Sequence, residues 1–178
     1  MRGIPYASAV GSLIYAMLCT RPDICFAVGM VSRYQSKPGE EHWIVVKHIL
    51  KYHRRTRNYV LVYQDESLEP IGYADSDFQS DPESRKSTSG YMFTLGGGAI
   101  SWRSVKQPSI ADSTMEVEYI VASEVAKETV WLKNFLMDLK VVPFAQSAIT
   151  LFCDNRGVVA NSKELRSHKR GSTISFER

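Results

Sequence analysis

Carboxylate side chains stand beside three predicted secondary-structure elements in the 178-residue chain. Asp75 ends a predicted strand, Asp154 follows another, and a third carboxylate belongs to the first turns of a long predicted helix. Carboxylate oxygens are hard ligands that suit Mg²⁺ or Mn²⁺. Two such ions about 3.5–4 Å apart activate a water and stabilise a leaving oxygen in phosphodiester cleavage. One Asp alone is usually a turn former or a helix cap, but three carboxylates in the order strand, hairpin, helix, strand favour a metal-dependent site.

The predicted helix offers two candidates for the third carboxylate, Glu116 and Glu118. They lie two residues apart and point about 200° apart around a helix, so one pocket cannot receive both. Ser113 and Glu116 have the S-x-x-E spacing of a capping box, which gives both of them a structural role at the helix start. Glu118 shares a face with the apolar residues at 121, 122 and 125. We therefore prefer Glu118 as the metal ligand and keep Glu116 as the alternative.

The first 58 residues have the pattern of a small all-helical segment. Apolar side chains recur at helical spacing over 7–19. Pro22 is suited to the first turn of a second helix that runs to about Tyr34, because the N–H that proline lacks would have no partner within the helix there. After a break at 36–39, a third helix is predicted over about 39–55. Its apolar stripe consists of Trp43, Val46, Ile49, Leu50 and His53.

From residue 59 onward the pattern is that of a sheet and helices. Strands are predicted at 59–63, 70–75, 90–95, 99–103 and 149–153, and helices at 114–139 and 157–163. Three consecutive glycines, 96–98, predict a tight hairpin between two of the strands. The tail over 167–173 is polar and aperiodic. We expect an α/β fold, a mixed sheet flanked by helices, in which the strands at Asp75 and Asp154 are adjacent and parallel.

Charge is distributed unevenly, although the formal net charge is only +3. The run 47–57 carries only basic charges, and 58–84 carries acids with no Lys or Arg. A basic face beside an acidic pocket suits an enzyme that acts on a polyanion, whereas the alternative is an ordinary solvated face. The residues predicted to contact a nucleic-acid backbone are Lys47, Lys51, Arg54, Arg55 and Arg57, together with Arg103, Lys106 and Gln107 on or just after a hairpin strand.

Several classes of protein are disfavoured. The three cysteines, Cys19, Cys25 and Cys153, form no CxxC pair and no cluster with zinc-ligand spacing, so neither disulfides nor structural zinc is expected. No apolar run approaches the roughly 20 residues of a membrane span. The N-terminus has no secretory h-region, so we expect an intracellular protein without a membrane partner, in a compartment that the residues do not specify.

Several ordered motifs carry a family resemblance that extends to about Arg170. They are YADSDF at 73–78, RKSTSGY at 85–91, ISWRSVKQ at 100–107, STMEVEY at 113–119, WL at 131–132 and CDN at 153–155. Together they resemble the ribonuclease H domain of copia-type retrotransposon Pol polyproteins. Upstream, GSLIY at 11–15 and TRPDI at 20–24 resemble the preceding C-terminal part of the reverse transcriptase region.

The resemblance implies a ribonuclease H-like fold and cleavage of the RNA strand of RNA–DNA hybrids with two Mg²⁺ or Mn²⁺ ions. It implies that Asp75, Glu118 and Asp154 are the catalytic, metal-binding residues. The implied partners are an RNA–DNA hybrid or other nucleic acid and the remainder of a Pol polyprotein. The implied domains are a helical segment over 1–58, from the reverse transcriptase region, and a ribonuclease H-like domain over 59–178.

The C-terminal end departs from the family pattern. Family members continue past the region of His168 with a further strand and helix, which carry a fourth metal-binding Asp, and no matching motif occurs here. We therefore expect the domain over 59–178 to lack its final strand and helix, as in a truncated Pol. The alternative to an active nuclease is a catalytically inactive remnant that at most binds nucleic acid.

Overall fold

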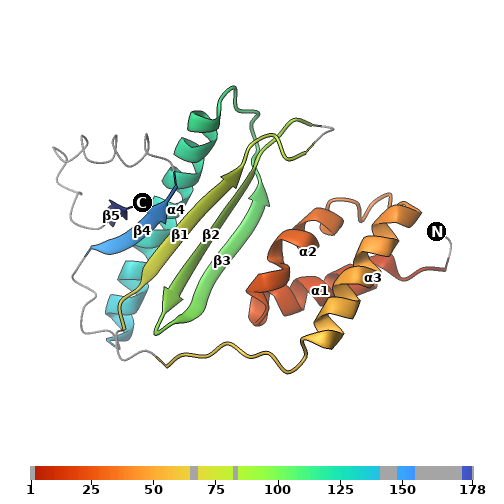
Figure 1. Ribbon diagram of the computed structural model, residues 1–178, viewed down its shortest axis with the longest axis horizontal. Helices are drawn as coiled ribbons and strands as arrows, with labels where there is room; N and C mark the ends of the chain where they lie inside the picture. Colours follow the sequence, from red (N-terminus) through yellow and green to blue (C-terminus); the bar gives the residue numbers. More distant parts are fainter. Residues whose placement is uncertain (1–2, 65–67, 82–83, 141–147, 155–173, 178) are drawn as a thin grey trace. The chain divides into compact units, whose positions relative to one another are not determined.

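The computed structural model describes residues 3–64, 68–81, 84–140, 148–154 and 174–177. The chain divides into two compact units, Met1–Leu61 and Val62–Arg178. The first is helical, and the second is built on a sheet (Figure 1). Among the described residues, no helix combines the length and the apolar character needed to cross a membrane.

The helical unit contains α1 (Tyr6–Cys19), a short 3₁₀ helix (Pro22–Ile24), α2 (Cys25–Ser32) and α3 (Glu40–Arg55). Pro22 occupies the first turn of the 3₁₀ helix, where its fixed φ is favourable and its missing N–H costs no hydrogen bond. Apolar side chains from all four helices form one buried core. Its members are Tyr6, Val10, Leu13, Ile24, Val28, Val31, Val46 and Ile49.

A buried arginine joins the 3₁₀ helix to the end of α3. The Arg21 guanidinium donates to both carboxylate oxygens of Asp23, at 2.8 and 2.6 Å, and to the Thr56 hydroxyl at 2.7 Å. The Tyr52 hydroxyl donates to the same carboxylate at 2.9 Å. Only 7% of Arg21 is exposed, so this network satisfies a charge that would otherwise be buried without a partner.

The second unit is a five-stranded sheet in the order β3-β2-β1-β4-β5. The strands are β1 (Ile71–Asp77), β2 (Thr88–Leu95), β3 (Gly98–Lys106), β4 (Ile149–Cys153) and β5 (Ile174–Glu177). The pairs β1–β2 and β2–β3 are antiparallel, whereas β1–β4 and β4–β5 are parallel. The long helix α4 (Thr114–Leu139) connects β3 to β4 and lies across one face of the sheet (Figure 1).

The core of this unit lies between α4 and the sheet. Its buried side chains are Ala74, Phe93, Val121, Val125, Leu132, Leu136, Ile149 and Leu151. Gly72 in β1 leaves room for the side chains of Leu151 and Phe93 from the two neighbouring strands, because a β-carbon at this position would collide with both. The architecture confirms the predicted fold class, a mixed α/β sheet after a helical segment, and is consistent with a ribonuclease H-like fold.

Most predicted elements occur where the sequence pattern indicated. The helix at 114–139 and the strand at 149–153 are confirmed at the predicted residues. The glycine-turn hairpin is also confirmed, with strands that extend beyond the predicted 90–95 and 99–103. The prediction of a strand and a parallel neighbour at Asp75 is confirmed as well, since β1 pairs with β4 in parallel.

Two expectations were wrong. Residues 59–63 form no strand, and Tyr59 and Val60 are about three-quarters exposed, at 73% and 76%. At its end the segment contacts the hairpin, since the Tyr63 hydroxyl donates to the Ala99 carbonyl at 2.8 Å and the next N–H, of Gln64, donates to the Gly96 carbonyl at 3.0 Å. We also expected no strand beyond β4, but β5 pairs with β4 there. The helix predicted at 157–163 lies outside the described residues.

Candidate metal and nucleic-acid site

Two candidate carboxylates lie near the carboxyl ends of one pair of parallel strands. The register of β1 and β4 ends at the partners Ala74 and Cys153. The next residue along each strand is an aspartate, Asp75 still within β1 and Asp154 directly after β4, so the parallel pairing brings both to the carboxyl ends of these strands. Both side chains are exposed. The carboxyl ends of adjacent parallel strands are where open α/β sheets most often bind ligands.

Glu116 and Glu118 have different positions at the start of α4. Ser113 is the N-cap, and its hydroxyl accepts a hydrogen bond from the Glu116 N–H at 3.2 Å. The Glu116 carboxylate accepts from the Asp112 N–H at 2.9 Å, so it reaches back one residue beyond the cap. Glu118 instead faces the sheet and is only 7% exposed. The helix therefore uses Glu116 for its own start and directs Glu118 toward the strands.

The Glu118 carboxylate is held by side chains from both parallel strands. The Ser76 hydroxyl of β1 donates to Glu118 Oε1. The Cys153 thiol of β4 donates to Glu118 Oε2, with 3.7 Å between sulfur and oxygen. Ser76 and Cys153 each adjoin one of the two aspartates in sequence. Each carboxylate oxygen of Glu118 thus has its own donor, and the side chain is fixed between β1 and β4.

The surroundings of Glu118 favour a bound cation. Burial raises the pKa of this carboxyl most, the Ser76 hydrogen bond lowers it, and the charges of Asp154 and Asp75 raise it. The hydrogen bond from Cys153 lowers it. The groups that act on Glu118 in this way are thus carboxylates, a hydroxyl and a thiol. None of these groups is positively charged, and a divalent cation would supply the positive charge.

One group of donor atoms within the described residues is compact enough to share a metal ion. One atom each of Glu118, Cys153 and Asp154 lies within 4.8 Å of the other two. The structure thus brings Glu118 and Asp154 together and adds Cys153, for which the sequence predicted neither a disulfide nor structural zinc. Asp75 is not part of this group. Its carboxylate accepts from the Ser76 N–H at 2.8 Å, and it acts on Glu118 through its charge.

The predicted basic face of α3 is exposed. Lys47, Lys51, Arg54 and Arg55 recur at three- and four-residue spacing along the helix, and Arg57 follows its end; all five are exposed. In the second unit, Arg103 on β3 is exposed. Lys106 is partly buried and forms an ion pair with Asp81. Both sets therefore place basic side chains at the surface, with Lys106 partly neutralised.

The expectation for Gln107 was wrong, because this side chain is 1% exposed and cannot contact a nucleic acid. Its amide nitrogen donates to the Ser89 hydroxyl at 2.7 Å and to the Val117 carbonyl at 3.4 Å. Val117 directly precedes Glu118. Gln107 therefore joins β2 to the first turns of α4. The polar residue type suggested the surface, whereas its amide nitrogen has hydrogen-bond acceptors in the interior.

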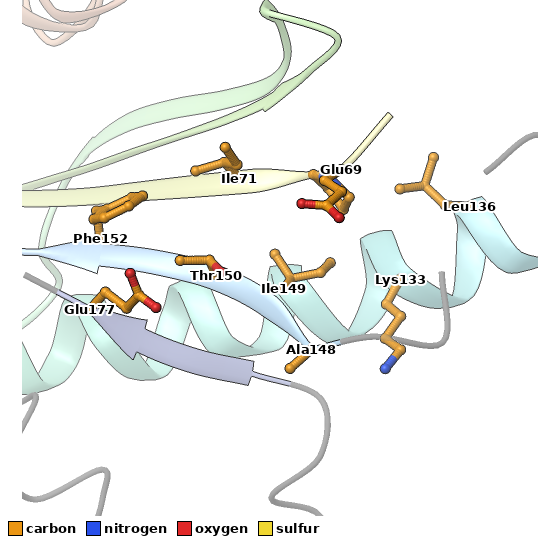
Figure 2. A pocket seen from close by; sticks show the side chains of 10 residues that line it. Glu69, Ile71, Lys133, Leu136, Ala148, Ile149, Thr150, Phe152 and Glu177 are labelled. Atoms are coloured by element: carbon orange, nitrogen blue, oxygen red, sulfur yellow. The ribbon is translucent and has the colours of Figure 1, made fainter. Parts of the chain in front are cut away.

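A cavity of about 250 Å³ lies away from the three carboxylates. Figure 2 shows Ile71 and Ile149 at the beginnings of β1 and β4, together with Lys133 and Leu136 of α4. Asp75, Glu118 and Asp154 do not line it. This cavity is therefore separate from the candidate site, in which Asp75 and Asp154 are exposed and Glu118 is buried.

Comparison with known proteins places the chain beside transposon sequences. No protein-family model matches it. It is 48% identical over 174 residues to the retrovirus-related Pol polyprotein from transposon TNT 1-94 of Nicotiana tabacum, which covers 98% of the chain and 13% of that polyprotein. It is 33% identical over 173 residues to the corresponding polyprotein from transposon RE2 of Arabidopsis thaliana, covering 97% of the chain and 12% of the polyprotein.

A shorter relative aligns over most of its own length. The chain is 46% identical over 133 residues to secreted RxLR effector protein 161 of Plasmopara viticola, which covers 74% of the chain and 94% of that protein. The chain thus spans about an eighth of the Pol polyproteins and nearly all of this shorter protein.

Proposed function

We propose that the chain is part of a retrovirus-related Pol polyprotein, since it is similar to such polyproteins along nearly its whole length, and that its second unit is a ribonuclease H domain. Its substrate would be an RNA–DNA hybrid, of which it hydrolyses the RNA strand. The observation that carries this proposal is the meeting of Asp154 and the buried Glu118 beside Asp75, at the end of two adjacent parallel strands.

The carboxylates fit Mg²⁺ or Mn²⁺ by their chemistry. Asp75, Glu118 and Asp154 would hold two such ions, which activate a water and neutralise charge at the phosphate in hydrolysis. Oxygen donors suit both ions, and Glu118 lies among other acids without a cation among the groups that act on it most. The two exposed aspartates leave one side of the site open to a bulky polyanion.

The residues around the carboxylates would keep the site in place. Ser76 and Cys153 fix both oxygens of Glu118. Gln107 fixes the helix turn that carries Glu118. A site at the ends of two paired strands and on a packed helix needs little rearrangement when substrate binds. Catalytic sites depend on such preorganised positions.

A second candidate function is nucleic-acid binding without cleavage. The exposed row Lys47, Lys51, Arg54 and Arg55 on α3 favours it, because neutralising phosphates needs no metal and no carboxylate. Under this alternative the chain would bind the hybrid but leave it intact.

The test is cleavage of a labelled RNA–DNA hybrid by the full chain with Mg²⁺ or Mn²⁺. Asp154→Asn removes an exposed carboxylate of the proposed site, and Asp112→Asn is the matched control, an exposed aspartate at the start of α4. We expect Asp154→Asn to lower the rate at least 10–100-fold, roughly the loss that even an outer-shell metal partner produces. Asp112→Asn should cleave at the rate of the unaltered chain. Binding without cleavage would favour the second candidate.

A further inference from the structure

The donor group beside the sheet contains a sulfur atom that the proposed hydrolysis does not use. Cys153 belongs to β4 and is 3% exposed, and its thiol points to the carboxylate of Glu118 on α4 (Figure 1 shows the two elements). Asp154 adds an exposed carboxylate from the next position along the chain. One sulfur and two carboxylates from two different elements therefore converge within 4.8 Å.

The spacing of two of these atoms, from Cys153 and Glu118, is close to that around a small four-coordinate ion. Zn²⁺ binds thiolate sulfur at about 2.3 Å and carboxylate oxygen at about 2.0–2.2 Å in tetrahedral geometry, so two such ligands lie about 3.6 Å apart. Cys153 Sγ and Glu118 Oε2 are 3.7 Å apart before any ion is considered. The separation of up to 4.8 Å across the whole group needs a contraction of about 1 Å to reach that geometry.

The chemistry of the donor set selects the class of metal. Mg²⁺ prefers oxygen ligands, whereas thiolate selects Zn²⁺ and other soft or borderline ions. Three protein ligands with a fourth position open to solvent are a common zinc arrangement, and one of the three residues here, Asp154, is exposed. Cys153 packs beside Ala122 in a small apolar cluster and also contacts the Glu118 carboxylate, so it has both an apolar and a polar neighbour.

We propose that Glu118, Cys153 and Asp154 form a binding site for a thiophilic divalent ion of the Zn²⁺ and Cd²⁺ class. On binding, the Cys153 S–H bond breaks, its proton passes to solvent and a metal–sulfur bond forms, without any change of oxidation state. The inference rests on the site of the proposed nuclease, since the same two carboxylates serve both. Zn²⁺ would therefore compete with Mg²⁺ or Mn²⁺ and inhibit hydrolysis.

Cd²⁺ is a suitable probe because a cadmium–thiolate bond absorbs in the ultraviolet, where carboxylate-bound cadmium does not. The full metal-free chain is titrated with Cd²⁺ while this absorption is recorded, beside Cys153→Ser and Cys25→Ser. Cys25 is the matched control, a second buried thiol that lies in the helical unit. We expect a one-to-one band in the unaltered chain and in Cys25→Ser, and loss of that band in Cys153→Ser.

Asp154→Asn provides a second measurement that leaves the thiol in place. Because Asp154 is exposed, its replacement should fold, and the lost ligand should weaken Cd²⁺ binding at least 10–100-fold, roughly as for an outer-shell partner. An unchanged affinity in Asp154→Asn, or an unchanged band in Cys153→Ser, would overturn the inference even if one variant fails to fold. A chain that binds Cd²⁺ through Cys153 but never cleaves a hybrid would refute the proposed nuclease and leave this site standing.

Discussion

Ser76 and Glu118 are 42 residues apart in the chain, and the Ser76 hydroxyl donates to the Glu118 carboxylate beside Asp75. This hydrogen bond joins β1 to α4 at the edge where Asp75 and Asp154 emerge. It also lowers the pKa of Glu118 against the effect of burial. Ser76 therefore favours the charged form of the one buried carboxylate of the candidate site and fixes its position.

Replacing Ser76 should weaken metal binding. Ser76→Ala removes the donor, so the Glu118 pKa should rise and its carboxylate should become less fixed. We expect Mn²⁺ affinity, measured by calorimetric titration at neutral pH, to fall roughly 10–100-fold, as for other outer-shell partners. Ser101→Ala is the matched control, because the Ser101 hydroxyl donates to Glu128 of the same helix at 2.9 Å. An equal loss in both variants would show that the effect is general loosening of α4.

The two glutamates at the start of α4 should respond differently to replacement. If Glu118 is a ligand, Mg²⁺ or Mn²⁺ should raise the melting temperature of the unaltered chain by mass action. Glu118→Gln or Asp75→Asn should abolish most of that rise. Glu116→Gln should retain it and cost at most about 1 kcal/mol, because only the helix start is weakened. Loss of the metal effect in Glu116→Gln, but not in Glu118→Gln, would reverse the assignment.

Binding of nucleic acid through α3 should depend steeply on salt. Each phosphate that Lys47, Lys51, Arg54, Arg55 or Arg57 neutralises on a duplex should add about −0.9 to the slope of log affinity against log salt. Replacing Lys51 and Arg55 together by Gln should make the slope shallower by about 2 in fluorescence anisotropy titrations. Replacing Lys127 and Lys133 of α4 is the control in the other unit. An unchanged slope in the α3 variant would exclude this face.

The helical unit should lose stability in acid through Asp23. The hydrogen bond from Arg21 lowers the pKa of this carboxyl most, and the bond from Tyr52 lowers it further. A lowered pKa in the folded state means that the contribution is present above the ordinary value of 3.8 and is lost as the pH falls through the folded value. Because Asp23 is partly exposed, we expect a loss of under about 1 kcal/mol.

Hydrogen exchange of the α3 amides between pH 5 and about 2.5 reports the free energy of unfolding of this unit and therefore measures that loss. Asp23→Asn should be less stable than the unaltered chain at pH 5 and should show a flatter dependence on pH. A pH profile that is the same with and without Asp23 would contradict the assigned role of the Arg21–Asp23 pair.

Long or strongly signalled elements could be predicted from the sequence. The helix at 114–139 has a capping serine and seven turns of apolar spacing, and the glycine turn at 96–98 specifies its hairpin. Residues 59–63 have side chains that favour a strand, but they pair with no neighbouring strand. The strand preference of such side chains depends on packing against a neighbouring strand. The strand at 174–177 was not predicted, because four residues carry too little pattern without knowledge of β4 beside them.

The candidate site was predictable where the signal is local to one strand or helix. Asp75 lies near the end of β1 and Asp154 directly follows β4, and the strand patterns of the sequence indicate both positions. Glu118 was separable from Glu116 by helical periodicity and by the S-x-x-E cap. The contributions of Cys153 and Gln107 depend on which atoms they meet across the sheet and helix, and no local pattern specifies that. The Cys-Asp step at 153–154 was the only available signal for the sulfur.

Strand-resolved cleavage of an RNA–DNA hybrid tests the central claim most directly. The hybrid carries one fluorophore on its RNA strand and a second on its DNA strand, and the full chain is incubated with it in Mg²⁺ and, separately, in Mn²⁺. The account predicts that the RNA strand is cut internally, that the DNA strand stays intact, and that Glu118→Gln removes the cutting. An intact RNA strand in both metals, with the protein folded and the hybrid bound, would contradict it.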